Sequence, residues 1–136
     1  MFTDETPFSD AFGKLLLRLS LGVLVLFHGV AKIMHPQAIE TISGRLSDLG
    51  LPSVLVYGVY IGEVVAPLML IFGVFARVAG TLVTINMIFA LILVHRAQVF
   101  LLTAHGGWDL ELQWMYLACG LVIAFIGGGR FALIKD

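Results

Sequence analysis

Cysteine is almost absent from this chain of 136 residues, because Cys119 is the only one. A single cysteine cannot form a disulfide within its own chain, and it cannot supply the CxxC pair of a dithiol redox site. The sequence also has no phosphate-binding glycine loop, no dinucleotide-binding glycine pattern and no nucleophile elbow. These absences exclude an autonomous dithiol enzyme and leave no nucleotide or catalytic motif.

Charge is scarce as well. Only 12% of the residues are charged and the net charge is −1, so nothing in the composition suggests binding to nucleic acid. Apolar residues make up 60% of the chain, and the mean hydropathy is +1.02. A soluble domain of this length does not need so much apolar surface, and it would show amphipathic helices or alternating strands. The composition therefore predicts a protein that lies in a lipid bilayer.

Four apolar blocks follow one another, and each is within or close to the length that crosses a bilayer, about 20 residues. The blocks cover residues 15–33, 53–75, 78–94 and 112–128. Four such helices can form one compact bundle, and no internal repeat or linker divides the chain. We therefore predict an all-α, integral membrane four-helix bundle, with residues 1–136 as a single domain.

The segment between the first two blocks, residues 35–51, predicts a short helix lying on the membrane surface. Pro36 suits the first turn of a helix, and Ile39, Ile42 and Leu46 recur at helical spacing after it. The bundle is therefore expected to carry one additional short helix between its first and second spans.

The second and third blocks are separated only by Ala76 and Arg77, which predicts an antiparallel hairpin with Arg77 at its turn. An even number of spans places both termini and this turn on one side of the membrane. That side carries Lys14, Arg18, Arg77, Arg130 and Lys135, whereas the other carries Lys32, Arg45 and Arg96. Because cytoplasmic segments are enriched in Lys and Arg, both termini are predicted to be cytoplasmic.

Glu63 is the only charged side chain in residues 53–75. At about 1.5 Å per residue it lies roughly 15 Å below the outer boundary, near the middle of the membrane. A carboxylate at that depth costs several kcal/mol to insert, and it is usually paired, protonated or functional. A ligand or proton role, and a structural role beside Lys32, Arg18 or a histidine, both remain open.

Other polar side chains fall in the outer half of the spans. His28 and Lys32 are four residues apart and share one helix face. Together with Glu63, they predict an outward-facing polar pocket in the bundle, walled by apolar and aromatic groups. The candidates for its ligand or proton site are Glu63, His28, Lys32, His95, Glu111, Tyr60 and Trp108. Each has a structural alternative, such as helix packing for a histidine, snorkelling for Lys32 or interfacial anchoring for Trp108.

Two arginines and the remaining histidines have other expected roles. Arg18 is predicted to be a structural charge that anchors the inner interface or pairs with a helix terminus, and Arg77 is predicted to be a structural charge at the turn. The histidines show neither an HxxxH nor an ExxH spacing. We therefore expect no bound metal.

Six short motifs follow one another and cover residues 15–130. They are LLLRLSLG with Arg18, FHGVAK at Phe27–Lys32, the isolated Glu63, FGVFARVAG at Phe72–Gly80, GGWDLELQW at Gly106–Trp114 and a glycine-rich end at Gly127–Arg130. In this order they resemble the DoxX family of four-helix bacterial membrane proteins. The family's acidic residue after the Gly-Gly pair is either Asp109 or Glu111, and the final motif reads GGGR where relatives often have GPGR.

The resemblance implies a bacterial inner-membrane location and a link to redox chemistry, because members of the family are associated with quinone-coupled oxidation of reduced sulfur, with oxidoreductase complexes and with oxidative-stress defence. A quinone head group needs an apolar slot, a donor for each carbonyl and a supply of protons. His28, His95 and Glu63 can provide the donors and the protons. The main expectation is therefore a quinone-binding subunit of a membrane redox system, and a membrane or extracytoplasmic partner supplies its electrons.

Two alternatives remain. The chain can be a non-catalytic assembly or scaffold subunit whose polar residues only hold helices together. It can also be a small proton-coupled transporter, which would require a homo-oligomer because four helices leave little room for alternating access.

Overall fold

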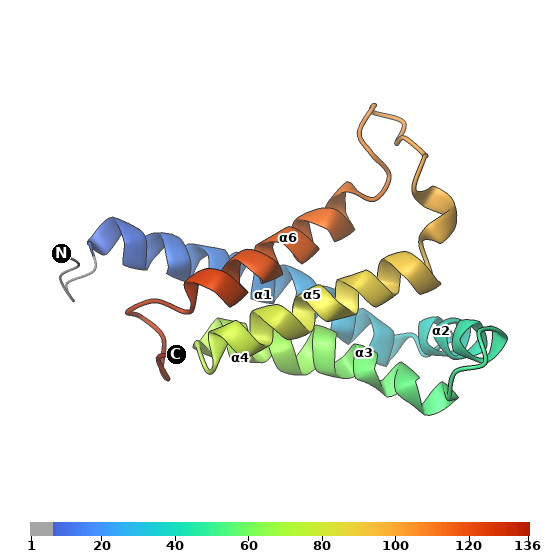
Figure 1. The fold of residues 1–136 in the computed structure, drawn as a ribbon, viewed down its shortest axis with the longest axis horizontal. Helices are drawn as coiled ribbons and strands as arrows, with labels where there is room; N and C mark the ends of the chain where they lie inside the picture. Colours follow the sequence, from blue (N-terminus) through green and yellow to red (C-terminus); the bar gives the residue numbers. More distant parts are fainter. Residues whose placement is uncertain (1–6) are drawn as a thin grey trace.

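The computed structural model describes residues 7–136, and over that range the chain is helical and forms no β-strand (Figure 1). The elements are α1 (Phe8–Met34), α2 (Gln37–Asp48), η1 (Ser53–Tyr57), α3 (Gly58–Tyr60), η2 (Ile61–Val65), α4 (Ala66–Phe72), α5 (Ala76–Leu93), η3 (Arg96–Gln98) and α6 (Glu111–Ile126). Two of these, η1 and η3, are 3₁₀ helices, and η2 is a single π-helical turn. The predicted all-α class is confirmed.

Among residues 7–136, three stretches are long and apolar enough to cross a membrane, namely α1, the composite helix Ser53–Phe72 and α5. The fourth, α6, has 16 residues. At about 1.5 Å per residue it is about 24 Å long, which is less than the hydrocarbon thickness of about 30 Å. It ends before the predicted residue 128 because Gly127, with φ of 79°, turns the chain out of the helix.

The first helix starts earlier than its predicted boundary at residue 15. Pro7, whose φ is −55°, directly precedes it, and Asp10 and Lys14 form an ion pair of 2.9 Å on its first turns. A proline ring fixes φ near the helical value, which suits the start of a helix. Polar residues thus interrupt the apolar pattern without interrupting the helix, and hydropathy alone placed its start too late.

The turn between the second and third spans lies at Gly73, Val74 and Phe75, and Arg77 is the second residue of α5. The prediction that Arg77 forms this turn is therefore wrong. Gly73 ends α4 with φ of 71°, and a Cβ added there would lie 2.7 Å from the Cα of Ala132. Only glycine combines this left-handed conformation with such a close backbone neighbour.

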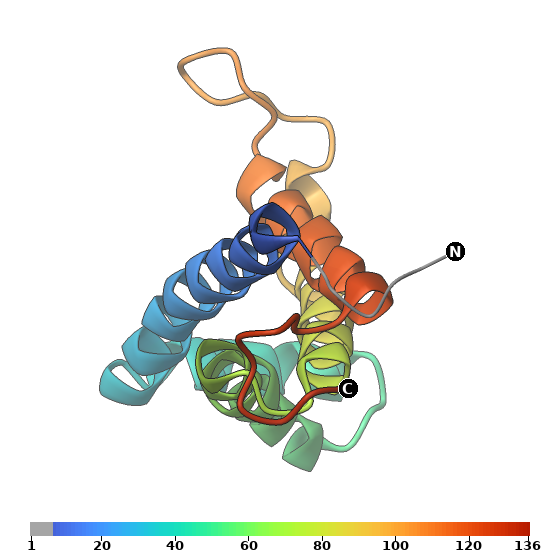
Figure 2. The ribbon, with the colours of Figure 1, turned by 90° about the vertical axis from the view of Figure 1, so that its left-hand side faces the viewer.

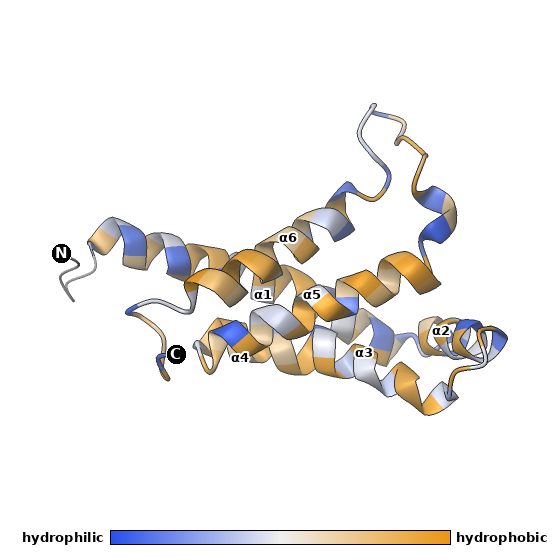
Figure 3. Cartoon of the chain, viewed as in Figure 1, coloured by the Kyte–Doolittle hydropathy of each residue, from blue (hydrophilic) through white to orange (hydrophobic). Residues whose placement is uncertain are grey.

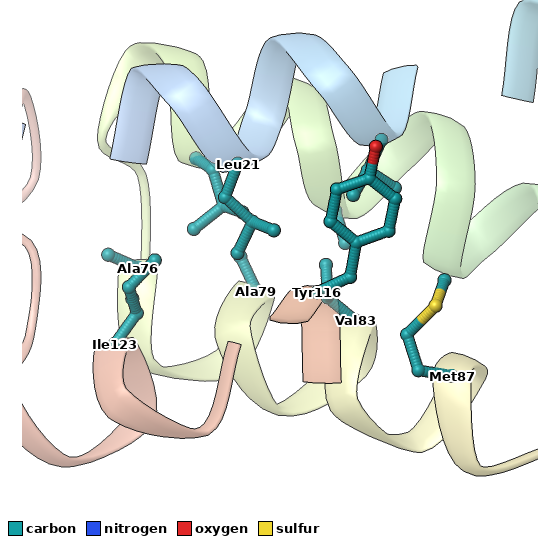
Figure 4. Packing of buried hydrophobic residues seen from close by; sticks show 10 residues of the cluster. Leu21, Ala76, Ala79, Val83, Met87, Tyr116 and Ile123 are labelled. Atoms are coloured by element: carbon teal, nitrogen blue, oxygen red, sulfur yellow. The ribbon is translucent and has the colours of Figure 1, made fainter. Parts of the chain in front are cut away.

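The core is formed where α5 and α6 pack together against α1 and α4. A Cβ added to Gly80 would lie 2.5 Å from the Gly120 carbonyl oxygen, so these two glycines allow the backbones of α5 and α6 to touch. Around this contact Figure 4 shows a tightly packed set of buried side chains. The labelled members are Leu21, Ala76, Ala79, Val83, Met87, Tyr116 and Ile123.

The two ends of the bundle differ. The start of α1 and the C-terminal segment lie at one end, whereas α2 and the connection from α5 to α6 lie at the other (Figure 1). An end-on view shows that residues 99–110 of this connection extend away from the helices (Figure 2). The start of α1 and the C-terminal segment share one end because the long helices run antiparallel.

Hydrophobic residues cover the outside of the helices, and hydrophilic residues gather at α2, at η3 and at the start of α1 (Figure 3). Phe27 on α1 and Phe125 on α6 are 68% and 73% exposed. Large apolar surfaces of this kind are stable in contact with lipid tails and not with water. The chain is therefore a helical membrane protein.

The short helix predicted within residues 35–51 is present as α2. Its residues Ile42 and Leu46 are buried against Val56 and Leu93 in a small separate cluster. Arg45 donates a hydrogen bond of 3.3 Å from Nη1 to the carbonyl oxygen of Leu93, near the end of α5. These contacts hold α2 across one end of the bundle.

Both predicted structural arginines bind helix C-termini. Arg18 is 1% exposed, and it donates from Nη1 to the Leu70 carbonyl at 2.7 Å and from Nε to the Gly128 carbonyl at 3.0 Å. Arg77 donates from Nη1 to the Phe125 carbonyl at 2.6 Å, at the end of α6. The last carbonyls of a helix lack partners and carry partial negative charge, so each guanidinium stabilises the end of a helix.

Candidate functional site

Glu63 lies in the π-helical turn η2, and Pro67 explains why this turn is not α-helical. Proline has no N–H, so the carbonyl of Glu63 cannot receive the usual bond from the residue four positions later. The chain widens instead, and the Ala66 N–H bonds to the carbonyl of Ile61, five positions earlier. Single π turns of this kind occur frequently at functional sites.

The carboxylate of Glu63 is paired with Lys32. The Lys32 Nζ atom lies 2.6 Å from Glu63 Oε1, and the Glu63 side chain is 6% exposed whereas that of Lys32 is 21% exposed. Gly29, one turn before Lys32, allows this contact, because a Cβ there would lie 2.0 Å from the Glu63 backbone oxygen. The close approach of α1 and η2 thus brings the ammonium group to a carboxylate inside the bundle.

A cavity of about 430 Å³ adjoins this ion pair, at the end of the bundle where α2 lies. Ligand sites in proteins typically have volumes of about 300–1,000 Å³, so the cavity is large enough for a small molecule. Its walls come from α1, α2, α3, η2, α5 and α6, and most of the lining is apolar. Of the residues predicted from the sequence, it brings together Glu63, His28, Lys32 and His95.

The two histidines have polar neighbours of their own. His28 Nε2 lies 3.5 Å from the Tyr116 hydroxyl, at the limit of a hydrogen bond, and the two rings meet edge to face. In Figure 4 the Tyr116 hydroxyl points towards α1. His95 donates from Nδ1 to the side-chain oxygen of Gln98, which leaves Nε2 available to accept a hydrogen bond. Both imidazoles line the cavity.

Two amide side chains at the cavity were not among the predicted site residues. Asn86 on α5 and Gln113 on α6 both line it. Asn86 Nδ2 and Gln113 Oε1 are shielded from solvent and have no hydrogen-bond partner among residues 7–136. Buried polar atoms without a hydrogen-bond partner are rare in native proteins. Asn86 is an isolated amide within an apolar helix, and this is the signal in the sequence that could have identified it, whereas Gln113 lies in the first turn of α6, two residues after Glu111.

Three other predicted site residues do not line the cavity. Tyr60 stacks on Tyr57 with 6.4 Å between ring centroids. Trp108 donates from its indole N–H to the Val99 carbonyl at 2.7 Å, and this bond holds the loop between α5 and α6. Glu111 is exposed at the first turn of α6.

The acidic residues after the Gly-Gly pair therefore lie away from the ion pair and its cavity. Glu111 begins α6, where a negative charge is stabilised by the helix dipole. The backbone N–H of Asp109 bonds to the carbonyl of Leu101 within the loop, and neither carboxylate belongs to the cavity lining.

Within the described residues 7–136, no group of three or more His, Cys, Asp or Glu side chains lies close enough to hold a metal ion. Cys119 is a free, half-buried thiol on α6.

The protein is thus a helical membrane bundle in which a buried lysine–glutamate ion pair adjoins a mostly apolar cavity. Residues 13–96, more than half of the chain, match the DoxX family. The chain belongs to the DoxX family.

Two relatives match over most of their length. An uncharacterized protein of Haemophilus influenzae is 31% identical over 121 residues, which cover 86% of this chain and 84% of that protein. A protein of Bacillus subtilis, named as the putative oxidoreductase CatD, is 30% identical over 125 residues, which cover 92% of this chain and 87% of that protein. No solved structure matches the chain.

Proposed function

We propose that this protein is a quinone-binding subunit of a membrane redox system, and that the cavity beside Glu63 and Lys32 holds the quinone head group. The observation that carries the proposal is the cavity itself, which combines a mostly apolar lining with the Lys32–Glu63 ion pair and with the side chains of His28, Asn86 and Gln113. A relative over nearly the full length bears the name of a putative oxidoreductase, which favours the same class of chemistry.

The lining fits a quinone in two respects. Apolar side chains such as Met87 and Leu93 can contact the ring, and donors can reach its carbonyl oxygens from Asn86 and Lys32. When bound, a quinone supplies the redox chemistry, because it accepts two electrons and two protons. We propose that His28 and the Lys32–Glu63 pair, which line the cavity, move those protons inside the bundle.

The chain itself contains one cysteine and offers no dithiol, so in this proposal the electrons come from a partner protein or from a bound small molecule. We place that partner at the end of the bundle that carries α2 and residues 99–110, next to the cavity. With both termini in the cytoplasm of a bacterium, this end faces the outside of the inner membrane.

Mass spectrometry of lipid-soluble molecules that copurify with the protein tests this function. The wild-type protein is expected to retain a quinone, and Glu63→Gln and His28→Ala are expected to retain less. An absence of quinone from wild-type protein, together with an absence of binding when quinone is added in lipid, would contradict the proposal. In that case a scaffold role for the polar residues would explain the same contacts.

A further inference from the structure

The connection between α5 and α6 folds back on itself as a hairpin over residues 99–109. The Thr103 N–H donates to the Gly107 carbonyl at 2.7 Å, and the Asp109 N–H donates to the Leu101 carbonyl at 2.9 Å. These bonds join backbone groups of the hairpin to one another. Backbone groups that lie among lipids need such internal partners, because no water is available there.

One limb of this hairpin is apolar and is not covered by the rest of the chain. Phe100 is 96% exposed and Leu102 is 70% exposed. Residues 99–108 contain no Asp, Glu, Lys or Arg. A contiguous run of large, exposed apolar side chains without a charge is unfavourable in water and typically contacts an apolar partner.

The position of the hairpin indicates that this partner is lipid. At about 24 Å, α6 is about 6 Å shorter than the hydrocarbon thickness. In Figure 1 it begins before the level that the end of α5 reaches, and the hairpin extends sideways from the bundle instead of past the end at which α2 lies. The apolar limb therefore continues the lipid-facing surface of the neighbouring helices, where Ile92 of α5 and Trp114 of α6 are half exposed.

We propose that the hairpin is an interfacial membrane anchor, and that its residues 99–102 insert between the lipids of the leaflet at the α2 end of the bundle. Phe100 contacts the acyl chains. The indole N–H of Trp108 is bonded to the Val99 carbonyl at 2.7 Å, so the Trp108 ring holds the apolar limb in place at the level where aromatic side chains favour the interface. The proposal does not depend on which molecule fills the cavity.

Polar residues around the hairpin limit the depth of the insertion. Asp109 and Glu111 lie at its end, and charged side chains are costly in hydrocarbon. The insertion is therefore shallow, from the headgroups to the first part of the acyl chains. Hydrophilic residues gather at α2 and η3 (Figure 3), so these elements remain in water and are the surface left to a partner protein.

Spin labelling of the full-length protein in nanodiscs of phosphatidylcholine tests the insertion. A nitroxide is attached at Phe100→Cys, in a background in which Cys119→Ala removes the native thiol. Its collisions with oxygen, which concentrates in lipid, are compared with its collisions with a water-soluble nickel complex. Ser47→Cys on α2 is the matched aqueous control, because Ser47 is exposed at the same end of the bundle, and Phe125→Cys on α6 is the lipid-facing reference.

At Phe100 the collisions with oxygen are expected to exceed those with the nickel complex, as at Phe125, and at Ser47 the order is expected to be reversed. The order of Ser47 at Phe100 would show that the hairpin lies in water and would overturn the proposal. Protection from both reagents would overturn it as well, because a side chain that its own chain leaves 96% exposed would then be covered by a second copy. Leu102→Cys repeats the comparison and decides it if Phe100→Cys does not fold.

Discussion

Replacing Lys32 by methionine isolates the buried charge of Glu63. The two side chains are joined at 2.6 Å, and the Glu63 carboxylate has almost no contact with solvent. Removing one partner of a buried ion pair typically costs about 3–5 kcal/mol, because the other charge remains without compensation. The side chain of Lys32 is 21% exposed, which places the expected loss near the lower limit, at about 3 kcal/mol.

Removing the charge of Glu63 instead is expected to cost less free energy of unfolding. Glu63→Gln leaves an oxygen that still accepts a hydrogen bond, and the remaining Lys32 ammonium can extend along its flexible stem towards the interface. We expect a loss of about 1 kcal/mol, close to the contribution of one hydrogen bond. The double variant is expected to be more stable than Lys32→Met alone, with a coupling energy of about 2 kcal/mol.

The first helix contains a matched control. Lys14 pairs with Asp10 at 2.9 Å and is as exposed as Lys32, at 21%, but its carboxylate partner is 42% exposed instead of 6%. A surface pair contributes at most about 1 kcal/mol, so Lys14→Met is expected to cost less than 1 kcal/mol. The two variants thus differ mainly in the burial of the carboxylate.

The free energies of unfolding can be measured by titration with sodium dodecyl sulfate in mixed micelles, with circular dichroism as the signal. Two results would show that the buried pair does not stabilise the bundle. One is a loss of unfolding free energy in Lys32→Met no larger than in Lys14→Met. The other is an equal loss in Lys32→Met and Glu63→Gln, with the loss in the double variant equal to their sum.

Three further predictions concern the packing around the same helices. Gly29→Ala is expected to lower the free energy of unfolding by about 3 kcal/mol or more, because the added Cβ would overlap the Glu63 carbonyl. Gly13 has no atom within 4 Å of an added Cβ, so Gly13→Ala is expected to raise the free energy of unfolding by about 0.5–1 kcal/mol. Equal effects of the two substitutions would contradict the close contact at Gly29. Arg18→Leu is expected to cost about 2–4 kcal/mol through two lost charge-assisted bonds, and a change below 0.5 kcal/mol would contradict its role. Pro67→Ala restores an N–H for the Glu63 carbonyl, so the π turn is expected to become α-helical. Quinone binding is then expected to weaken while the helix content stays unchanged. An unchanged affinity for quinone would contradict a role of the π turn in the site.

Much of the fold could be predicted from the sequence, because length and apolar composition determine which helices can enter a bilayer. The apolar blocks that contain His28 and Glu63 are both helical in the structure, and α2 lies where the periodicity of the sequence predicted a helix. Two helix boundaries differ from the prediction. Helix α1 includes the polar turn at Asp10, and the hairpin turn lies at the left-handed Gly73 instead of at Arg77.

The site was only partly predictable, for a physical reason. The depth and the helical phase of a residue follow from counting residues along a helix, and they correctly predicted that Glu63 and Lys32 lie in the same region. Phase counting assumes 3.6 residues per turn, and the π turn before Pro67 changes it locally. The inward direction of Asn86 and Gln113 depends on how α5 and α6 pack, which no single helix specifies.

Photolabelling with an azido-substituted quinone shows whether the ring lies in the cavity beside Glu63. In lipid nanodiscs, the label is expected on the cavity segments of α5 and α6, at residues 86–95 and 112–116, and an excess of unlabelled quinone is expected to prevent it. Glu63→Gln is expected to reduce the labelling at these segments. Labelling confined to lipid-facing residues such as Phe125, unaffected by competitor, would show that the cavity does not bind a quinone.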